Sequence, residues 1–231
     1  MKNFSDKSHP FRLKVWGENA CFTRPEMKVE RVSYDVMTPS AARGIFEAIL
    51  WKPAIRWKVT QIDVLAPIKW ESVRRNEVGC TMSPNTEGFC VDEVGSDGNL
   101  KYRQQRAGLF LREVTYVIHA YFEMTDKAGD DDNVIKFQEM FLRRAKKGQC
   151  FHRPYLGCRE FAAEFEVFTN GKPLQEPISE TRDLGWMLYD IYHHNSGNGS
   201  PHFCNEECRP AFFRAKLING RMMVDEKEVR L

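Results

Sequence analysis

VTYVIHAYFEM, residues 114–124, and VIKFQEMFLRRAKKG, residues 134–148, are the two runs that decide the fold of this chain. Apolar and polar side chains alternate along the first run, which is the two-residue period of a β-strand. The second run has the helical period, with one apolar face made of Val134, Phe137, Phe141 and Ala145. Acidic residues precede it and a glycine ends it, as expected at the two ends of a helix. We therefore expect a strand followed by a helix over 133–147.

Elements of the same kinds lie before and after this pair. A strand is expected from Phe11, a helix from Thr38 to about Trp51, and further strands over 54–68 and 161–168. The resulting order, β-α-β-β-α-β, is the split-βαβ arrangement shared by many RNA-recognition domains. The sequence thus predicts an α+β, ferredoxin-like (RRM-like) domain over residues 1–168.

Two segments fall outside that pattern. Residues 69–111 form an insert that is too long for a structureless loop, so a hairpin or a functional lobe is expected there. Residues 169–231 are expected to form a small β-rich domain with strands over 184–192, 211–218 and 221–224. Asn219-Gly220 is a strong two-residue hairpin signal between the last two.

Composition points to a cytoplasmic location. The chain has 231 residues, average hydrophobic content and no apolar run near the roughly 18 residues of a spanning helix. The first ten residues are polar and lack the apolar region of a signal peptide. Seven cysteines, an odd number without a C-x-x-C pair, are expected to be reduced thiols.

Charge is distributed unevenly although the net charge is only +2. Residues 1–60 carry 11 basic and 6 acidic side chains, and residues 136–159 carry 7 and 1. A basic segment of this kind suits a phosphate backbone. Its charged residues alternate with aromatic ones near His152 and Tyr155, which suits stacking on unpaired bases, although a basic helix face is more often simply solvated.

Two short clusters of arginine and amide side chains bracket the loop inside the insert. They are Arg74-Arg75-Asn76 and Arg103-Gln104-Gln105-Arg106. Such groups offer bidentate phosphate contacts and hydrogen bonds to base edges. The alternative is a solvated, salt-bridged hairpin without a ligand.

Motifs for other chemistries are missing or weak. His193, His194, His202, Cys204 and Cys208 form the only cluster of metal-ligand residues, and their spacing is not a standard zinc pattern. No G-x-S-x-G, Walker A, G-x-G-x-x-G or H-E-x-x-H motif occurs. We expect neither a metal nor a cofactor.

Several stretches resemble one known family in the same order along nearly the whole chain. They are Trp16-Gly17, residues 20–34 and 38–45, Trp51-Lys52-Pro53, residues 74–78 and 103–106, and residues 155–161. The chain is similar to the fifth-family CRISPR-associated subunit of the type I-C (d-subtype) system. This resemblance implies a ferredoxin-like RNA-binding domain followed by a small β-sheet domain. It also implies cleavage of precursor CRISPR RNA at the base of the repeat hairpin, with retention of the 5′ handle.

The resemblance further implies metal-independent chemistry that leaves a 2′,3′-cyclic phosphate. Lys136 matches the family's lysine in the second helix, while Leu50 and Phe137 stand where the family usually has polar catalytic residues. Tyr34, His152 and Tyr155 are then the candidates for the base. Without such a base, the alternative is a catalytically weak or inactive subunit that binds the 5′ handle.

The expected partners are the repeat hairpin, the mature 5′ handle, and the backbone and large subunits of the type I-C complex. Non-specific DNA binding is a further expectation, and no membrane contact is expected. The residues expected to contact RNA are Arg24, Lys28, Arg31, Arg43, Arg74, Arg75, Asn76, Arg103, Gln104, Arg106, Arg143, Arg144, Lys146, Lys147 and Arg159.

Overall fold

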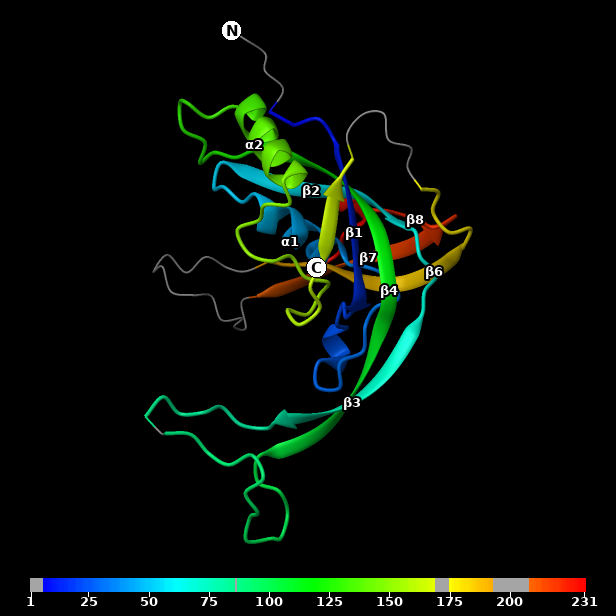
Figure 1. Ribbon diagram of the computed structural model, residues 1–231. Coiled ribbons are helices and arrows are strands. Elements are labelled where there is room, and N and C mark those ends of the chain that lie inside the picture. Colours follow the sequence, from blue (N-terminus) through cyan, green and yellow to red (C-terminus); the bar gives the residue numbers. More distant parts are fainter. Residues whose placement is uncertain (1–5, 86, 169–174, 193–207) are drawn as a thin grey trace.

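An antiparallel sheet organises the chain in the computed structural model, which describes residues 6–85, 87–168, 175–192 and 208–231 (Figure 1). The elements, in chain order, are β1 (Phe11–Ala20), α1 (Pro39–Ile49), β2 (Ile55–Val64), β3 (Trp70–Val78), β4 (Arg103–Met124), α2 (Val134–Lys146), β5 (Glu164–Val167), β6 (Arg182–Tyr192), β7 (Arg209–Ile218) and β8 (Arg221–Met223). Short 3-10 turns lie at Pro25–Met27 and Glu226–Glu228. The mixed α/β class expected from the sequence is confirmed.

The strands within the described ranges form one sheet in the order β5-β1-β4-β2-β8-β7-β6, with β3 paired to β4 alone. Every pairing is antiparallel. The C-terminal strands join the rest where β8 pairs with β2, for example Met223 opposite Gln61. The sheet is continuous through this pairing, and the division into two domains at residue 168 stays a prediction.

Both helices begin and end as their sequences predict. The Thr38 hydroxyl accepts a hydrogen bond from the Ala41 amide, and the Asn133 side chain accepts one from the Lys136 amide at 2.9 Å. Gly148, with φ of +64°, follows α2 in the left-handed conformation of a helix C-terminus. The Thr38 and Asn133 side chains satisfy amides that the first turn of a helix leaves without partners.

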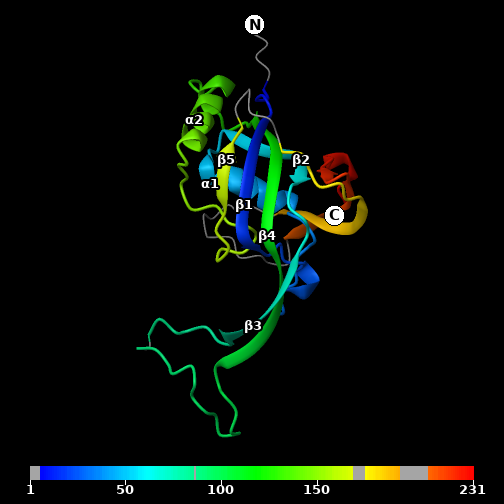
Figure 2. The ribbon, with the colours of Figure 1, turned by 45° about the vertical axis from the view of Figure 1, so that its right-hand side comes forward.

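The core lies between the sheet and the two helices, which cover the same face (Figure 2). Phe137, Phe141 and Ala145 of α2 are buried there, as the helical period predicts. The Phe141 ring lies 5.4 Å from Phe46 of α1 and 4.9 Å from Trp57 of β2, between ring centroids. These aromatic contacts fix α1 and α2 against one another.

The insert forms a hairpin of β3 and β4 that projects from the body of the molecule (Figure 1). β4 starts at Arg103 rather than Val114, because the returning arm of the hairpin runs directly into the central strand. Glu113, with a φ of 54°, interrupts the alternation of side chains between the insert and the strand predicted over 114–124. Likewise β1 continues through a polar stretch to Ala20, paired with Leu111.

The sequence also led to expectations about membrane spans, cysteines and a metal cluster. None of the helices within the described ranges is long and apolar enough to cross a membrane. Cys21, Cys80, Cys90, Cys150 and Cys158 are free thiols. The His193, His194, His202 and Cys204 members of the candidate metal cluster lie outside the described residues.

Candidate nucleic-acid interface

One face of α2 presents cations to solvent. Arg143, Lys146 and Lys147 are exposed, and none of the ion pairs found in the described ranges involves them. Arg144 differs from its neighbour, because it is half-buried and donates from Nη1 to the Ile49 carbonyl at 3.0 Å. Positive charge without a carboxylate partner remains available to phosphate, so Arg143 and the two lysines suit a nucleic-acid contact.

The hairpin divides its basic residues between two faces. Arg74 and Asn76 alternate with Arg75 and Glu77 along β3, and cross-strand pairs share a face. Arg74 and Asn76 are exposed, and no ion pair in the part of the chain described here involves Arg74. The outer face of the hairpin therefore offers one arginine and an amide to a ligand.

The opposite face is a salt-bridge network. Arg75 binds Glu160 at 2.6 Å, and Arg31 binds both Glu160 and Glu77. Arg106 extends the network to Glu77 at 3.8 Å. Arg31, Arg75 and Arg106 therefore form salt bridges, as in the alternative to RNA binding given above, and carboxylates of the same chain largely compensate their charge.

Other predicted RNA contacts also have partners. Arg103 pairs with Asp92, and Gln104 accepts a hydrogen bond from Arg106. Arg24 binds Asp35 at 3.0 Å and lies over the Tyr34 ring. By contrast, Lys28 and Arg159 are exposed, and no ion pair in the described part of the chain involves either.

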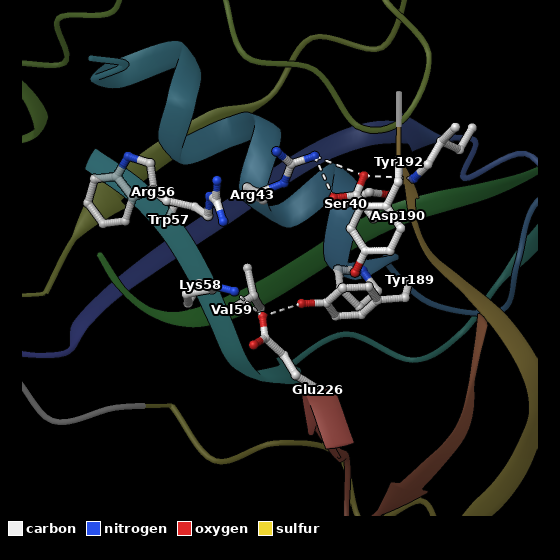
Figure 3. Close-up of a pocket in the computed structure, with 12 residues that line it drawn as sticks. Ser40, Arg43, Arg56, Trp57, Lys58, Val59, Tyr189, Asp190, Tyr192 and Glu226 are labelled. Carbon is white, nitrogen blue, oxygen red and sulfur yellow. Dashed lines mark hydrogen bonds and ion pairs between the residues drawn. The ribbon is translucent and has the colours of Figure 1, made fainter. Parts of the chain in front are cut away.

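Arg43 lies in a pocket of about 590 Å³ between α1, β2 and β6 (Figure 3). Its guanidinium binds Asp190 at 2.9 Å and Glu47 at 3.1 Å. Burial raises the pKa of Glu47, and the charge of Arg43 offsets part of this effect. Arg43 is therefore held by two carboxylates, whereas Arg56, which also lines the pocket, is exposed.

Lys136 lines a second pocket, of about 320 Å³, at the start of α2. Lys52 and Lys127 also line it, together with Asp132. Asp132 accepts a hydrogen bond from Lys136 Nζ at 2.9 Å, which lowers the pKa of the carboxyl group. Three ammonium groups around one carboxylate leave a net positive pocket that suits a phosphate.

Leu50 and Phe137, where the resemblance implies polar residues, both lie in the core, and Phe137 also lines this pocket. Leu50 is fully buried, and its carbonyl accepts a hydrogen bond from Trp57 Nε1 at 2.8 Å. Phe137 is 2% exposed and lies against Phe122. Neither hydrocarbon side chain transfers a proton.

The three candidate bases lie in different surroundings. Tyr34 is 1% exposed, its hydroxyl accepts a hydrogen bond from the Leu188 amide, and burial raises its pKa. Tyr34 does not line the Lys136 pocket. His152 is exposed and lies near Tyr155, with 6.5 Å between ring centroids. The structure brings His152 and Tyr155 together but places neither of them in the lining of the Lys136 pocket.

A tight turn fixes the segment that carries Tyr155. Gly157 has φ of +83°, and a Cβ atom there would lie 2.0 Å from the Cys21 carbonyl oxygen. Cys158 follows and lies beside Cys21, which is buried, and near the partly exposed Thr23 and Arg31. The Cys21 side chain has the largest effect on Cys158 and lowers its pKa; burial opposes this effect, and Thr23 and Arg31 lower the pKa further. The Cys158 thiol itself donates to the Cys21 carbonyl oxygen at 3.6 Å.

Sequence reasoning missed several exposed groups. Phe151 is 88% exposed and Trp51 is 61% exposed, and Lys52 and Lys127 join Lys136 in its pocket. The Trp51-Lys52-Pro53 run, an aromatic and a cation after a helix end, was the available signal for two of them. Lys127 had no such signal, because only folding places it beside Lys52.

A sequence model of the CRISPR-associated protein (Cas_Cas5) family matches residues 11–225, and the chain belongs to this family. Two relatives are named CRISPR pre-crRNA endoribonuclease Cas5d. The protein of Mannheimia succiniciproducens is 52% identical over 220 residues, which are 90% of this chain and 92% of the relative. The protein of Thermus thermophilus is 46% identical over 185 residues, 78% of this chain and 72% of the relative.

Two solved structures share the fold. A crystal structure of a CRISPR-associated protein superposes with a TM-score of 0.69 at 20% identity, covering 97% of this chain and 98% of the other. The Streptococcus mutans protein SMU1763c, described as functionally uncharacterized, gives a TM-score of 0.65 at 20% identity with the same coverage. The described part of this chain thus has the fold of those proteins.

Proposed function

We propose that this chain is an endoribonuclease that cleaves precursor CRISPR RNA at the base of the repeat hairpin and retains the 5′ handle. It then serves in the cytoplasm as a subunit of the type I-C surveillance complex, beside the backbone and large subunits. Family membership and the names of the two relatives support this activity. The strand order β5-β1-β4-β2 with two helices on one face supports a ferredoxin-like RNA-binding domain.

The observation that carries the proposal is the continuity between the lysine pocket and the basic face of α2. Lys136, Met140, Arg143 and Lys147 follow one another at helical spacing, so they share one face. A hairpin whose backbone follows this face places a phosphate near Lys136. The pocket then supplies charge at one phosphate, and the helix holds the neighbouring ones.

The chemistry proposed at that phosphate needs no metal. The ribose 2′-oxygen attacks the phosphorus while a base takes its proton, the bond to the 5′-oxygen breaks, and the leaving oxygen takes a proton. The products are a 2′,3′-cyclic phosphate and a 5′-hydroxyl. Lys136 stabilises the negative charge that develops on the phosphate oxygens. The exposed His152 is favoured over the buried Tyr34 as the base.

A second candidate function is a subunit that binds the 5′ handle without cutting. The burial of Leu50 and Phe137 favours it, because no proton-transfer group stands at the two positions used in the family. Loss of a general base typically costs about 10²- to 10⁴-fold in rate, so slow cleavage and no cleavage are both compatible with binding.

Cleavage of the chain's own repeat RNA in EDTA distinguishes these functions. We expect slow cutting that leaves a cyclic phosphate, strong reduction in Lys136→Ala, and no change in Lys227→Ala, which removes an exposed lysine from a distant turn. Replacing the 2′-hydroxyl at the cut site with hydrogen should abolish the reaction. Full activity of Lys136→Ala would remove Lys136 from the mechanism, and tight binding without any cutting would establish the handle-binding function instead.

A further inference from the structure

A cavity of about 310 Å³ lies between α1, the turn at 155–157 and β6. It is separate from the Lys136 pocket, and no residue lines both. None of the described residues that line it is charged. The lining residues are Phe22, Thr23, Thr38, Ser40, Ala41, Gly44, Tyr155, Gly157 and Leu188.

Gly44 stands in the middle of α1, where a glycine is unfavourable. Glycine in a helix interior is less stable than alanine by roughly 0.5–1 kcal/mol. A Cβ atom at Gly44 would meet nothing within 4 Å, so no contact inside the described chain demands a glycine. Gly44 lies within α1, and its φ is not positive, so its backbone conformation does not require a glycine either. What the glycine does provide is an open approach to the helix backbone from inside the cavity.

The lining has the chemistry of a nucleobase site. Tyr155 supplies an aromatic ring for stacking. Thr23, Thr38 and Ser40 supply hydroxyl groups, each with a partner inside the chain (Thr38 with Ala41 and Ser40, Thr23 with Cys21 and Cys158), and a hydroxyl has capacity for more than one hydrogen bond. The described residues of this lining include no lysine or arginine, which disfavours a phosphate as the occupant. A planar, neutral group with polar edges fits these walls.

The aromatic wall continues outward from the cavity. The Tyr155 ring lies near His152, and His152 contacts Phe151 with 6.0 Å between ring centroids. Phe151 is 88% exposed, and its amide binds the Ala48 carbonyl of α1 at 2.7 Å, one helical turn beyond Gly44. Exposed rings beside a basic helix suit the bases of a single strand.

We propose that this cavity binds one unpaired nucleotide of the repeat RNA, with its base against Tyr155 and its sugar over Gly44. The nucleotide must be unpaired, because a base inside a duplex cannot present its face to a side chain. The proposal rests on the proposed RNA-binding function and assigns to the cavity a nucleotide that flanks the hairpin.

Gly44→Leu fills the cavity and is the main test. Its matched control is Gln138→Leu, which adds the same side chain to a partly exposed position of α2. Because the space above Gly44 is open, the melting temperature of Gly44→Leu should equal or exceed that of the wild type. We expect it to bind repeat RNA about 5- to 150-fold more weakly, the range of one lost base stack. It should bind a hairpin without unpaired flanks as the wild type does.

A crosslinking experiment locates the nucleotide. Repeat RNAs with single 4-thiouridine substitutions at each unpaired position should crosslink from one position to the peptide that contains Tyr155. The crosslink should persist in Gln138→Leu and disappear in Gly44→Leu, and Tyr155→Phe should retain the affinity that Tyr155→Ala loses.

Unchanged affinity and an unchanged crosslink in a folded Gly44→Leu protein would overturn the cavity assignment while leaving RNA binding intact. Failure of the wild type to bind repeat RNA would instead refute the proposed function. If Gly44→Leu were to unfold, the Tyr155→Phe and Tyr155→Ala pair would decide the assignment alone.

Discussion

Arg144 on α2 donates a hydrogen bond to the Ile49 carbonyl at the end of α1, with 3.0 Å between Nη1 and the oxygen. The carbonyls of the last helical turn have no partner inside the helix, and a cation there also interacts favourably with the helix dipole. Arg143, the preceding residue, points to solvent. Two adjacent arginines thus serve different purposes, one in the fold and one on the surface.

This contrast gives the first prediction. Arg144→Ala should lower the free energy of unfolding by about 1.5–3 kcal/mol, the usual contribution of a hydrogen bond from a charged group. Arg143→Ala should change it by less than about 0.5 kcal/mol and instead weaken RNA binding. Urea unfolding and RNA titration of both variants measure this. Equal stability losses would contradict the assignment of Arg144 to the fold.

The two faces of the hairpin give the second prediction. Arg74→Ala should reduce the slope of log K against log salt by about 0.7, the value for one phosphate contact on a single strand. Arg75→Ala should leave the slope nearly unchanged, because Arg75 is bound to Glu160 and packs over Phe110 and Phe161. Its stability loss should stay under about 1 kcal/mol. RNA titrations across a salt series measure both slopes, and a larger change for Arg75→Ala would reverse the assignment.

The buried positions beside the lysine pocket give the third prediction. Phe137→His buries an imidazole among aromatic rings and should lower the melting temperature clearly. Leu50→Tyr overpacks a fully buried site, at a cost of about 1–3 kcal/mol. Ile135→His, at a position 53% exposed on the same helix, is the control and should be nearly neutral. Wild-type stability of Phe137→His would show that its site accepts a polar group.

Cys158 gives the fourth prediction. Only the thiolate is nucleophilic, so a lowered pKa lets alkylation reach its full rate at lower pH than the value of about 8.5 typical of a free thiol. Cys21→Ala, which removes the side chain that lowers the pKa of Cys158 most, should move the midpoint upward. Mass spectrometry of iodoacetamide labelling across a pH series measures it, with Cys158→Ser to assign the signal. A wild-type midpoint near 8.5 would contradict the lowered pKa.

Local sequence patterns predicted most of the helices and strands, because capping and the spacing of apolar residues depend on neighbours along the chain. Thr38 and Asn133 were recognisable as caps, and Phe137 and Phe141 as core, from spacing alone. The length of β4 was not, because a left-handed residue at Glu113 interrupts its alternation. The pairing of β8 with β2 also joins segments more than 150 residues apart, and no local pattern encodes it.

The candidate site shows the same division. The clustering of basic residues was visible in the sequence, but their pairing was not. Arg31 meets Glu160 and Arg43 meets Asp190 only after folding, so sequence could not separate compensated arginines from available ones. Burial of Tyr34 was equally hidden, because its polar neighbours along the chain suggested a surface position.

β4 has a mechanical consequence for the molecule. Its 22 residues have a contour length of about 70 Å and run from the hairpin to the centre of the sheet, with the irregular Glu113 between the two halves. A β-strand bonded on both sides is stiff, so β4 acts as a lever whose inner half lies between β1 and β2. A force that a bound molecule applies to the hairpin would therefore act on the inner half of β4, the part of the strand that the two helices cover. Hydrogen exchange along the inner half of β4 would report such a load.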